Sequence, residues 1–206
     1  MGNHIYTIGR EFGSGGYEVA NLLSEKLGIK LYDKNLLAQA AKESGFCQEI
    51  LENHDEKPTS SFLYSLVMET YTGGNYPTAP FLGMPLNHKV FLAQFDTIKK
   101  IAREESCVIV GRCADYALAD FGDVVNIFLH ADFEDRVRRI SKRRDLSDNK
   151  ARDLIQKMDK QRASYYNYYT CKKWGEAKSY DICLNTSKLS PEKCVDIILN
   201  YRENMK

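Results

Sequence analysis

The sequence predicts an α/β fold of three layers, in which five mostly parallel strands lie between helices. Five short runs rich in apolar and β-branched residues are separated by segments of helical period, and this alternation is typical of an open parallel sheet. The run at residues 107–110 is apolar throughout, as in strands buried on both faces. The run at residues 5–8 meets a glycine cluster, and a helical pattern begins directly after that cluster.

Size and composition indicate one soluble domain spanning residues 1–206. Apolar residues make up 43% of the chain and charged residues 28%, which is ordinary for a globular protein with a real core. The net charge of +1 gives no case for nucleic acid or a membrane surface as a partner. No apolar stretch approaches the roughly 20 residues of a membrane span. We therefore expect a cytoplasmic protein without a nucleic-acid or membrane partner.

The cysteines do not indicate a metal site. All six are scattered singly, and neither Cys-x2-Cys pairs nor histidines at zinc spacing accompany them. In a cytoplasmic chain they are expected to be reduced thiols. Cys107 and Cys183 lie in strand-like runs and are predicted to belong to the core.

The glycine cluster is the most informative stretch of the chain. Four glycines fall within residues 9–16, between a predicted strand and a predicted helix. Strand, tight turn and helix together aim backbone N–H groups and a helix dipole at one point, which makes an anion site. A plain strand-to-helix turn is the alternative, and the number of glycines favours phosphate binding over it.

Two phosphate-binding templates compete for this stretch. In the P-loop template Gly15 takes the second glycine, but Arg10 stands at the first glycine, Gly16 at the lysine and Tyr17 at the hydroxyl. In the dinucleotide template Gly13 and Gly15 fit, Glu18 occupies the third glycine, and Asp33 lies at the distance of a ribose-binding carboxylate. Neither template fits outright, so the residues of this stretch leave both open.

The remaining elements follow in order along the chain. Residues 29–32 predict a second strand, and Asp33 is placed to cap a helix over residues 34–43. Residues 44–87 hold four of the five prolines and are interpreted either as an insertion that covers a substrate or as a long surface loop. Further helices are predicted at 89–105, 136–144, 148–169 and from Ser190 onward, and further strands at 107–110, 124–129 and 180–185.

Arginines concentrate where a phosphate ligand would need them. Arg112 follows the strand at 107–110 almost at once, and ligands of open α/β sheets bind beyond the carboxyl ends of the strands. The segment at about 136–170 is rich in arginine and lysine, with acidic residues interspersed. Most such charges are solvated, yet guanidinium groups bind phosphate oxygens bidentately. We interpret this segment as a helical lid over a polyphosphate.

Several motifs, in this order, resemble the cytidylate kinase-like family, a branch of the P-loop nucleoside-monophosphate kinases. They are TIGREFGSGG at 7–16, LYDK at 31–34, VIVGRCADY at 108–116, FL at 128–129 with the arginine helix after it, and DKQR at 159–162 followed by two tyrosines. The resemblance covers nearly the whole chain. It implies a three-layer P-loop kinase-like fold with a five-stranded parallel sheet, an ATP site at the glycine loop, an acceptor-binding insertion at 44–87 and an arginine-rich lid.

The resemblance implies phosphoryl transfer from ATP, with Mg²⁺, to a nucleoside monophosphate such as CMP or to another small phosphorylated acceptor. The expected donor site comprises Gly13, Ser14, Gly15, Gly16, Tyr17 and Arg139, with Arg143 beside it on the lid and Glu18 as a magnesium ligand. Arg112 and Arg162 would clamp the acceptor phosphate, and Asp33, Asp115 and Asp159 are candidates to orient the acceptor or an arginine.

One departure from the family pattern keeps a second function open. The P-loop lysine normally follows the β- and γ-phosphates during transfer, and this chain has Gly16 in its place. Arg10, at the entrance of the loop, is the candidate to supply the missing cation. The alternative is a nucleotide-binding regulatory protein that kept the fold without catalysis, and a dinucleotide-dependent oxidoreductase comes third.

Overall fold

The computed structural model describes residues 3–33 and 86–205. The helix expected at 34–43 and the expected insertion up to residue 85 lie outside the described residues. The described elements are β1 (Ile5–Arg10), α1 (Gly16–Leu27), β2 (Lys30–Tyr32), α5 (Leu86–Glu104), β3 (Cys107–Val110), α6 (Ala114–Ala117), β4 (Val124–His130), α7 (Phe133–Arg144), α8 (Asp148–Thr170), the 3-10 turn η1 (Ala177–Ser179), β5 (Ile182–Asn185) and α9 (Pro191–Glu203).

The five strands form one parallel sheet in the order β2-β3-β1-β4-β5, which confirms the predicted fold class. Strand β1 lies at the centre, where Ile5 is in register with Cys107 of β3 on one side and with Val124 of β4 on the other. The chain therefore builds outward from β1 in two directions. A reversal of this kind leaves a crevice at the carboxyl ends of the central strands, where ligands bind in open α/β sheets.

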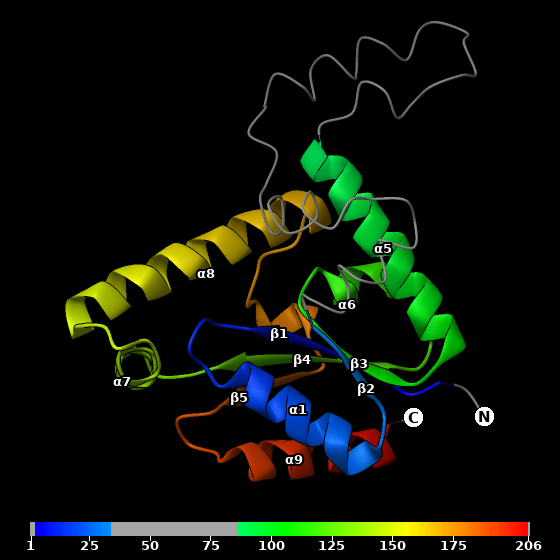
Figure 1. Cartoon of the computed structure of the whole chain (residues 1–206). Coiled ribbons are helices and arrows are strands. Elements are labelled where there is room, and N and C mark those ends of the chain that lie inside the picture. Colours follow the sequence, from blue (N-terminus) through cyan, green and yellow to red (C-terminus); the bar gives the residue numbers. More distant parts are fainter. Residues whose placement is uncertain (1–2, 34–85, 206) are drawn as a thin grey trace, which may run out of the picture.

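Helices cover both faces of the sheet, as Figure 1 shows. On one face, Val19 and Leu23 of α1 and Val195 of α9 pack against alternate residues of the strands, including Ile8. On the other face, helices α5 and α6 pack against the intervening residues, with Ile98 fully buried. The alternation of side chains along each strand sends successive residues into these two cores. Among the described helices, none is long and apolar enough to cross a lipid bilayer.

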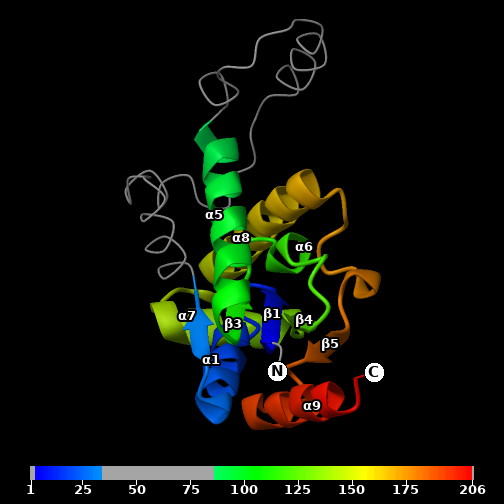
Figure 2. The same cartoon turned by 90° about the vertical axis from the view of Figure 1, so that its right-hand side faces the viewer.

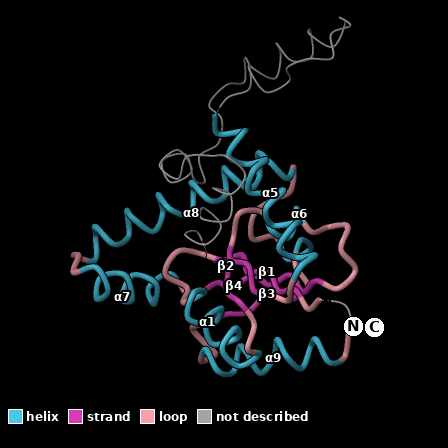
Figure 3. Tube along the Cα trace, turned by 45° about the vertical axis from the view of Figure 1, so that its right-hand side comes forward, coloured by secondary structure: helices cyan, strands magenta, loops and turns pink. Residues whose placement is uncertain are grey.

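Helices α7 and α8 form a hairpin beside the carboxyl edge of the sheet (Figure 3). Val137 and Ile140 of α7 and Ile155 of α8 are buried together, and Phe12 of the glycine loop packs against them. At its other end α8 lies close to α5 (Figure 2), where the rings of Phe91 and Tyr169 stack 3.9 Å apart. The predicted arginine-rich segment is thus anchored at both ends.

Strand β5 corrects one expectation about the core. Cys107 is fully buried in β3 as predicted, and burial raises the pKa of its thiol to about 12. Cys183 is exposed instead. The reason is that β5 is an edge strand whose residues alternate between buried and open positions, so every second side chain points away from the core. The strand also begins at Ile182 rather than at residue 180, because η1 precedes it.

Candidate functional site

The glycine loop turns sharply between β1 and α1. Gly13 and Gly15 have φ angles of +82° and +77°, a region that side chains with a Cβ rarely adopt. A Cβ atom at Gly13 would also lie 3.0 Å from Cγ1 of Ile140, so the loop closely approaches α7. Helix α1 begins at Gly16, and the first N–H groups of a helix have no intrahelical acceptor. The loop therefore offers backbone donors and a helix dipole to an anion.

A cleft of about 670 Å³ opens directly at this loop. Its volume falls in the range of about 300–1,000 Å³ that is usual for small-molecule sites. Six of the lining side chains are cationic and three are acidic, so the cleft favours an anionic ligand. The lining residues are Arg10, Glu11, Phe12, Gly13, Gly15, Gly16, Tyr17, Glu18, Asp33, Val110, Arg139, Ile140, Lys142, Arg143, Arg144 and Arg162.

Ten of the residues that the sequence predicted for the site line this cleft: Arg10, Gly13, Gly15, Gly16, Tyr17, Glu18, Asp33, Arg139, Arg143 and Arg162. Ser14 does not line it, because its side chain is fully buried and its hydroxyl donates to the carbonyl of Glu11 at 2.9 Å. The Ser14 carbonyl accepts a hydrogen bond of 2.5 Å from Oγ1 of Thr186. Ser14 thus stabilises the glycine loop through hydrogen bonds to Glu11 and Thr186.

The two donor-side arginines of α7 differ in their surroundings. Arg139 donates from Nη2 to the carbonyl of Thr186 at 2.8 Å and from Nη1 to Oγ1 of the same residue at 3.2 Å. Its Nη1 also donates to the carbonyl of Gly13 at 3.4 Å. Arg143 is 68% exposed and lies 3.9 Å from Oε1 of Glu18. Arg139 therefore ties the glycine loop to the end of β5, whereas Arg143 is held only loosely.

A partly buried ion pair connects the glycine loop to helices α7 and α8. Asp159 of α8 accepts hydrogen bonds from the backbone N–H of Phe12 at 2.7 Å and from Nη1 of Arg136 at 2.5 Å. Nε of Arg136 lies 3.5 Å from Oε2 of Glu11, and Nη1 also donates to the carbonyl of Phe12 at 3.4 Å. Asp159 does not belong to the described residues that line the cleft. Its carboxylate orients an arginine and the loop.

A second cavity lies behind the cleft, at the ends of β1 and β3. It holds about 20 Å³, roughly the space of one water molecule. Arg10 and Arg162 line both cavities and so form the wall between them. Arg162 donates from Nη1 to the carbonyl of Arg10 at 3.0 Å. The other polar residues of this inner cavity include Arg112, Asp115, Tyr166 and Tyr180.

The backbone holds Arg112 in an unusual conformation. Gly111, Arg112 and Cys113 have φ angles of +80°, +58° and +55°, three left-handed residues in succession after β3. Two of these residues carry a Cβ, and such conformations cost about 1–3 kcal/mol each. The guanidinium group of Arg112 is buried, with 4% of the residue exposed. The backbone at Arg112 is therefore strained, and it holds a buried arginine at the carboxyl end of β3.

Asp115 carries a half-buried carboxyl group. Burial raises its pKa above the ordinary value, and a hydrogen bond of 2.6 Å from the hydroxyl of Tyr166 opposes that rise. The pKa of Tyr166 is raised as well, by burial first and then by the nearby carboxylate. This pair connects the end of α8 to α6, so α8 reaches the inner cavity through a polar contact.

Sequence reasoning missed three residues that organise the site. Thr186 directly follows β5, and the rule that flagged Arg112 at the end of β3 would have flagged it too. Arg136 was visible only as one member of a basic helix. Tyr166 is one of the two tyrosines that follow the DKQR motif, which gives it no role of its own. Nothing in the local sequence distinguishes these two from their neighbours, because their partners lie on distant segments.

The described residues contain no group of three metal-ligating side chains. A nucleotide-bound Mg²⁺ takes one or two protein carboxylates and completes its octahedron with phosphates and water. Glu18 fits this requirement, since it lines the cleft and folds toward the loop, with Oε2 at 2.8 Å from the position of a Cβ on Gly15.

A parallel sheet in this strand order, with a glycine loop after its central strand and arginine-bearing helices beside its carboxyl edge, defines a P-loop kinase-like protein. The profile of the cytidylate kinase-like family matches residues 5–188, and the chain belongs to that family. This membership removes the dinucleotide template from consideration.

Two solved structures show the same fold. An uncharacterized protein from Eubacterium ventriosum ATCC 27560 is 31% identical, with a TM-score of 0.74, and the match covers 98% of this chain and 99% of that one. Shikimate kinase from Bacteroides thetaiotaomicron is 14% identical, with a TM-score of 0.52, and the match covers 97% and 98% of the two chains. No functionally curated protein matches the sequence.

Proposed function

We propose that this protein transfers the γ-phosphoryl group of ATP to a nucleoside monophosphate such as CMP, or to another small phosphorylated acceptor. The observation that carries the proposal is the cationic cleft of about 670 Å³ at the glycine loop. Phosphoryl transfer asks the protein for positioning and for stabilisation of negative charge rather than for a nucleophile. Backbone donors and converging guanidinium groups supply both.

On the donor side, the N–H groups at the start of α1 would hold the polyphosphate of ATP. Arg139 keeps the loop in shape through Gly13 and Thr186, and Arg143 is free to approach the phosphates from α7. Glu18 would hold the magnesium ion, which neutralises charge on the β- and γ-phosphates when bound. Release of Glu18 from Arg143 costs little, because both side chains are more than half exposed.

On the acceptor side, Arg162 would bind the acceptor phosphate directly, and Arg112 would support it from the inner cavity, which has room for about one water molecule. Arg162 already stands at the wall between the two cavities, and Arg112 lines the inner one. Asp33 lines the cleft at the end of β2, and its carboxylate would orient acceptor hydroxyls there. Asp115 and Asp159 would act on the acceptor site indirectly. Asp115 holds Tyr166 by a hydrogen bond, and Asp159 holds Arg136 and the glycine loop.

A coupled assay of ADP release tests the proposal. Purified protein with ATP and Mg²⁺ is offered CMP, dCMP, UMP, AMP and a panel of small phosphorylated metabolites in turn. We expect turnover with at least one acceptor, and loss of most of it in Arg162→Met. Arg138→Met serves as the control for a lost positive charge, because Arg138 is 72% exposed and lies outside the cleft lining. Tight ATP binding without turnover for any acceptor would reject the kinase function.

A regulatory nucleotide-binding protein is the second candidate, and Gly16 at the place of the P-loop lysine is the observation that favours it. Loss of a transition-state cation reduces rates by orders of magnitude while leaving many binding contacts intact. The same assay decides between the two functions, because this candidate binds ATP and releases no ADP.

A further inference from the structure

The side chain of Arg10 runs between two glycines. A Cβ atom built on Gly16 would lie 2.7 Å from Cβ of Arg10 and 3.0 Å from its Cγ. A Cβ atom built on Gly111 would lie 3.0 Å from Cζ of the same arginine. The stem of Arg10 therefore packs under the first turn of α1, and its guanidinium group rests against the end of β3.

These contacts make the residue types at positions 10 and 16 mutually dependent. The atoms that face Gly16 are the two nearest to the Arg10 backbone, so they cannot move aside as the end of a flexible side chain does. A lysine at position 16 and the observed path of Arg10 are thus incompatible. The nearest of these atoms is the Cβ of Arg10, so a lysine at position 16 requires glycine at position 10, which is the residue that the P-loop template has there.

Arg10 also borders the cleft that would hold the donor phosphates in the proposed function. Arg10 lines both the outer cleft and the inner cavity, as Arg162 does. Arg162 donates a hydrogen bond of 3.0 Å to the backbone carbonyl of Arg10, so both residues are positioned at the boundary between the two cavities. A preorganised cation between donor and acceptor stabilises the charge that develops during transfer.

We propose that Arg10 has taken over the task of the P-loop lysine and contacts the β- and γ-phosphates of the donor, with Gly16 and Gly111 providing the space for its side chain. This inference rests on the proposed function. A guanidinium group presents a planar fork of donors, whereas an ammonium group acts as a point charge, so the contact is expected to be bidentate.

A residue exchange tests the proposal. Arg10→Met is expected to lower kcat by about 100-fold or more, the usual effect of removing one transition-state donor. Arg10→Lys should recover part of that loss. The double variant Arg10→Gly, Gly16→Lys moves the cation back to helix α1 and, because glycine lacks the Cβ that would meet a side chain at position 16, should regain at least about tenfold over Arg10→Gly alone. Gly16→Lys in the presence of Arg10 should lower the midpoint of thermal unfolding.

The binding of inorganic tripolyphosphate, measured by calorimetry, separates this inference from the proposed function. Arg10→Met should weaken it by about tenfold or more, and the exposed control Arg138→Met by less than twofold. If the wild type turns over an acceptor and Arg10→Met keeps its kcat and its tripolyphosphate affinity, the inference is wrong and the kinase function stands. If no acceptor is turned over, the kinase function is wrong, and unchanged tripolyphosphate affinity in Arg10→Met would overturn the inference as well.

Discussion

The ion pair between Asp159 and Arg136 is expected to carry a large share of the stability of the glycine loop. Asp159 is 18% exposed and Arg136 9% exposed, and the carboxylate also accepts the backbone N–H of Phe12. In Asp159→Ala the buried guanidinium group loses its closest partner, and the N–H of Phe12 loses its acceptor. Both losses weaken the connection between the glycine loop and helices α7 and α8.

The magnitude follows from the contacts that remain. Removing one partner of a buried ion pair costs about 3–5 kcal/mol. Glu11 stays 3.5 Å from Nε of Arg136 and offsets part of that loss, so we expect Asp159→Ala to lower the free energy of unfolding by about 2–4 kcal/mol. At about 2–4 °C per kcal/mol for a chain of this size, the melting temperature should fall by roughly 4–16 °C.

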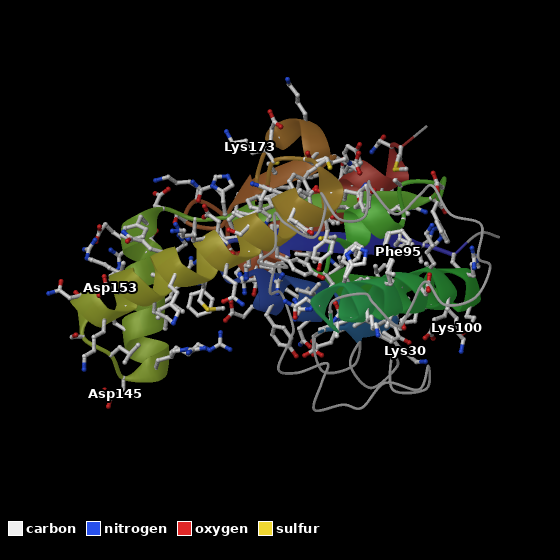
Figure 4. All side chains as sticks on the ribbon, turned by 90° about the horizontal axis from the view of Figure 1, so that it is seen from above. Lys30, Phe95, Lys100, Asp145, Asp153 and Lys173 are labelled. Atoms are coloured by element: carbon white, nitrogen blue, oxygen red, sulfur yellow. The ribbon has the colours of Figure 1, made fainter. Side chains whose placement is uncertain are left out.

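Urea unfolding followed by circular dichroism measures this change, and calorimetry with ATP measures its effect on the loop. Asp153 of the same helix, labelled in Figure 4, is exposed and provides a matched control. Asp153→Ala should alter the free energy of unfolding by less than about 0.5 kcal/mol. Equal stability of the Asp159→Ala and Asp153→Ala variants would refute the view that this ion pair holds the loop.

Three further predictions concern the loop and the inner cavity. Gly13→Ala forces a Cβ into a backbone with φ of +82° and to 3.0 Å from Ile140, so it should cost about 1–3 kcal/mol of stability and weaken ATP binding at least tenfold; unchanged affinity would contradict the role of the loop. Arg139→Met removes the hydrogen bonds to Thr186 and should cost about 1–2 kcal/mol in urea unfolding, which an unaltered midpoint would disprove. The folded pKa of Asp115 is raised above its ordinary 3.8, so the stability it contributes is full below about pH 3.8 and is lost as pH rises through the folded pKa. Asp115→Asn lacks this titration, so urea unfolding at a series of pH values above 3.8 should show the wild type losing stability relative to the variant as pH rises. A difference in the free energy of unfolding that stays constant with pH would exclude the effect.

Local sequence patterns were sufficient for most of the described elements. The fully apolar run at 107–110 became β3 with the predicted bounds, and the serine and proline at 190 and 191 mark the start of α9. These signals are short-range, since strand burial and helix capping depend on neighbouring residues. Cys183 shows where such reasoning fails, because the pattern of a strand does not reveal which of its faces the rest of the chain covers.

The sequence by itself determined the alternation of strands and helices and the glycine loop after the first strand, because periodicity and the steric freedom of glycine act within a few residues. Only the tertiary structure decided which of the many arginines matter. Arg136 is buried against Asp159, whereas Arg138, two residues later, is exposed. Arg10 runs between two glycines that are about 95 residues apart in the chain, and the pairing of β1 with β3 brings these glycines together in space. Charges that look alike in the sequence differ in role because burial and partners come from segments brought together by the sheet.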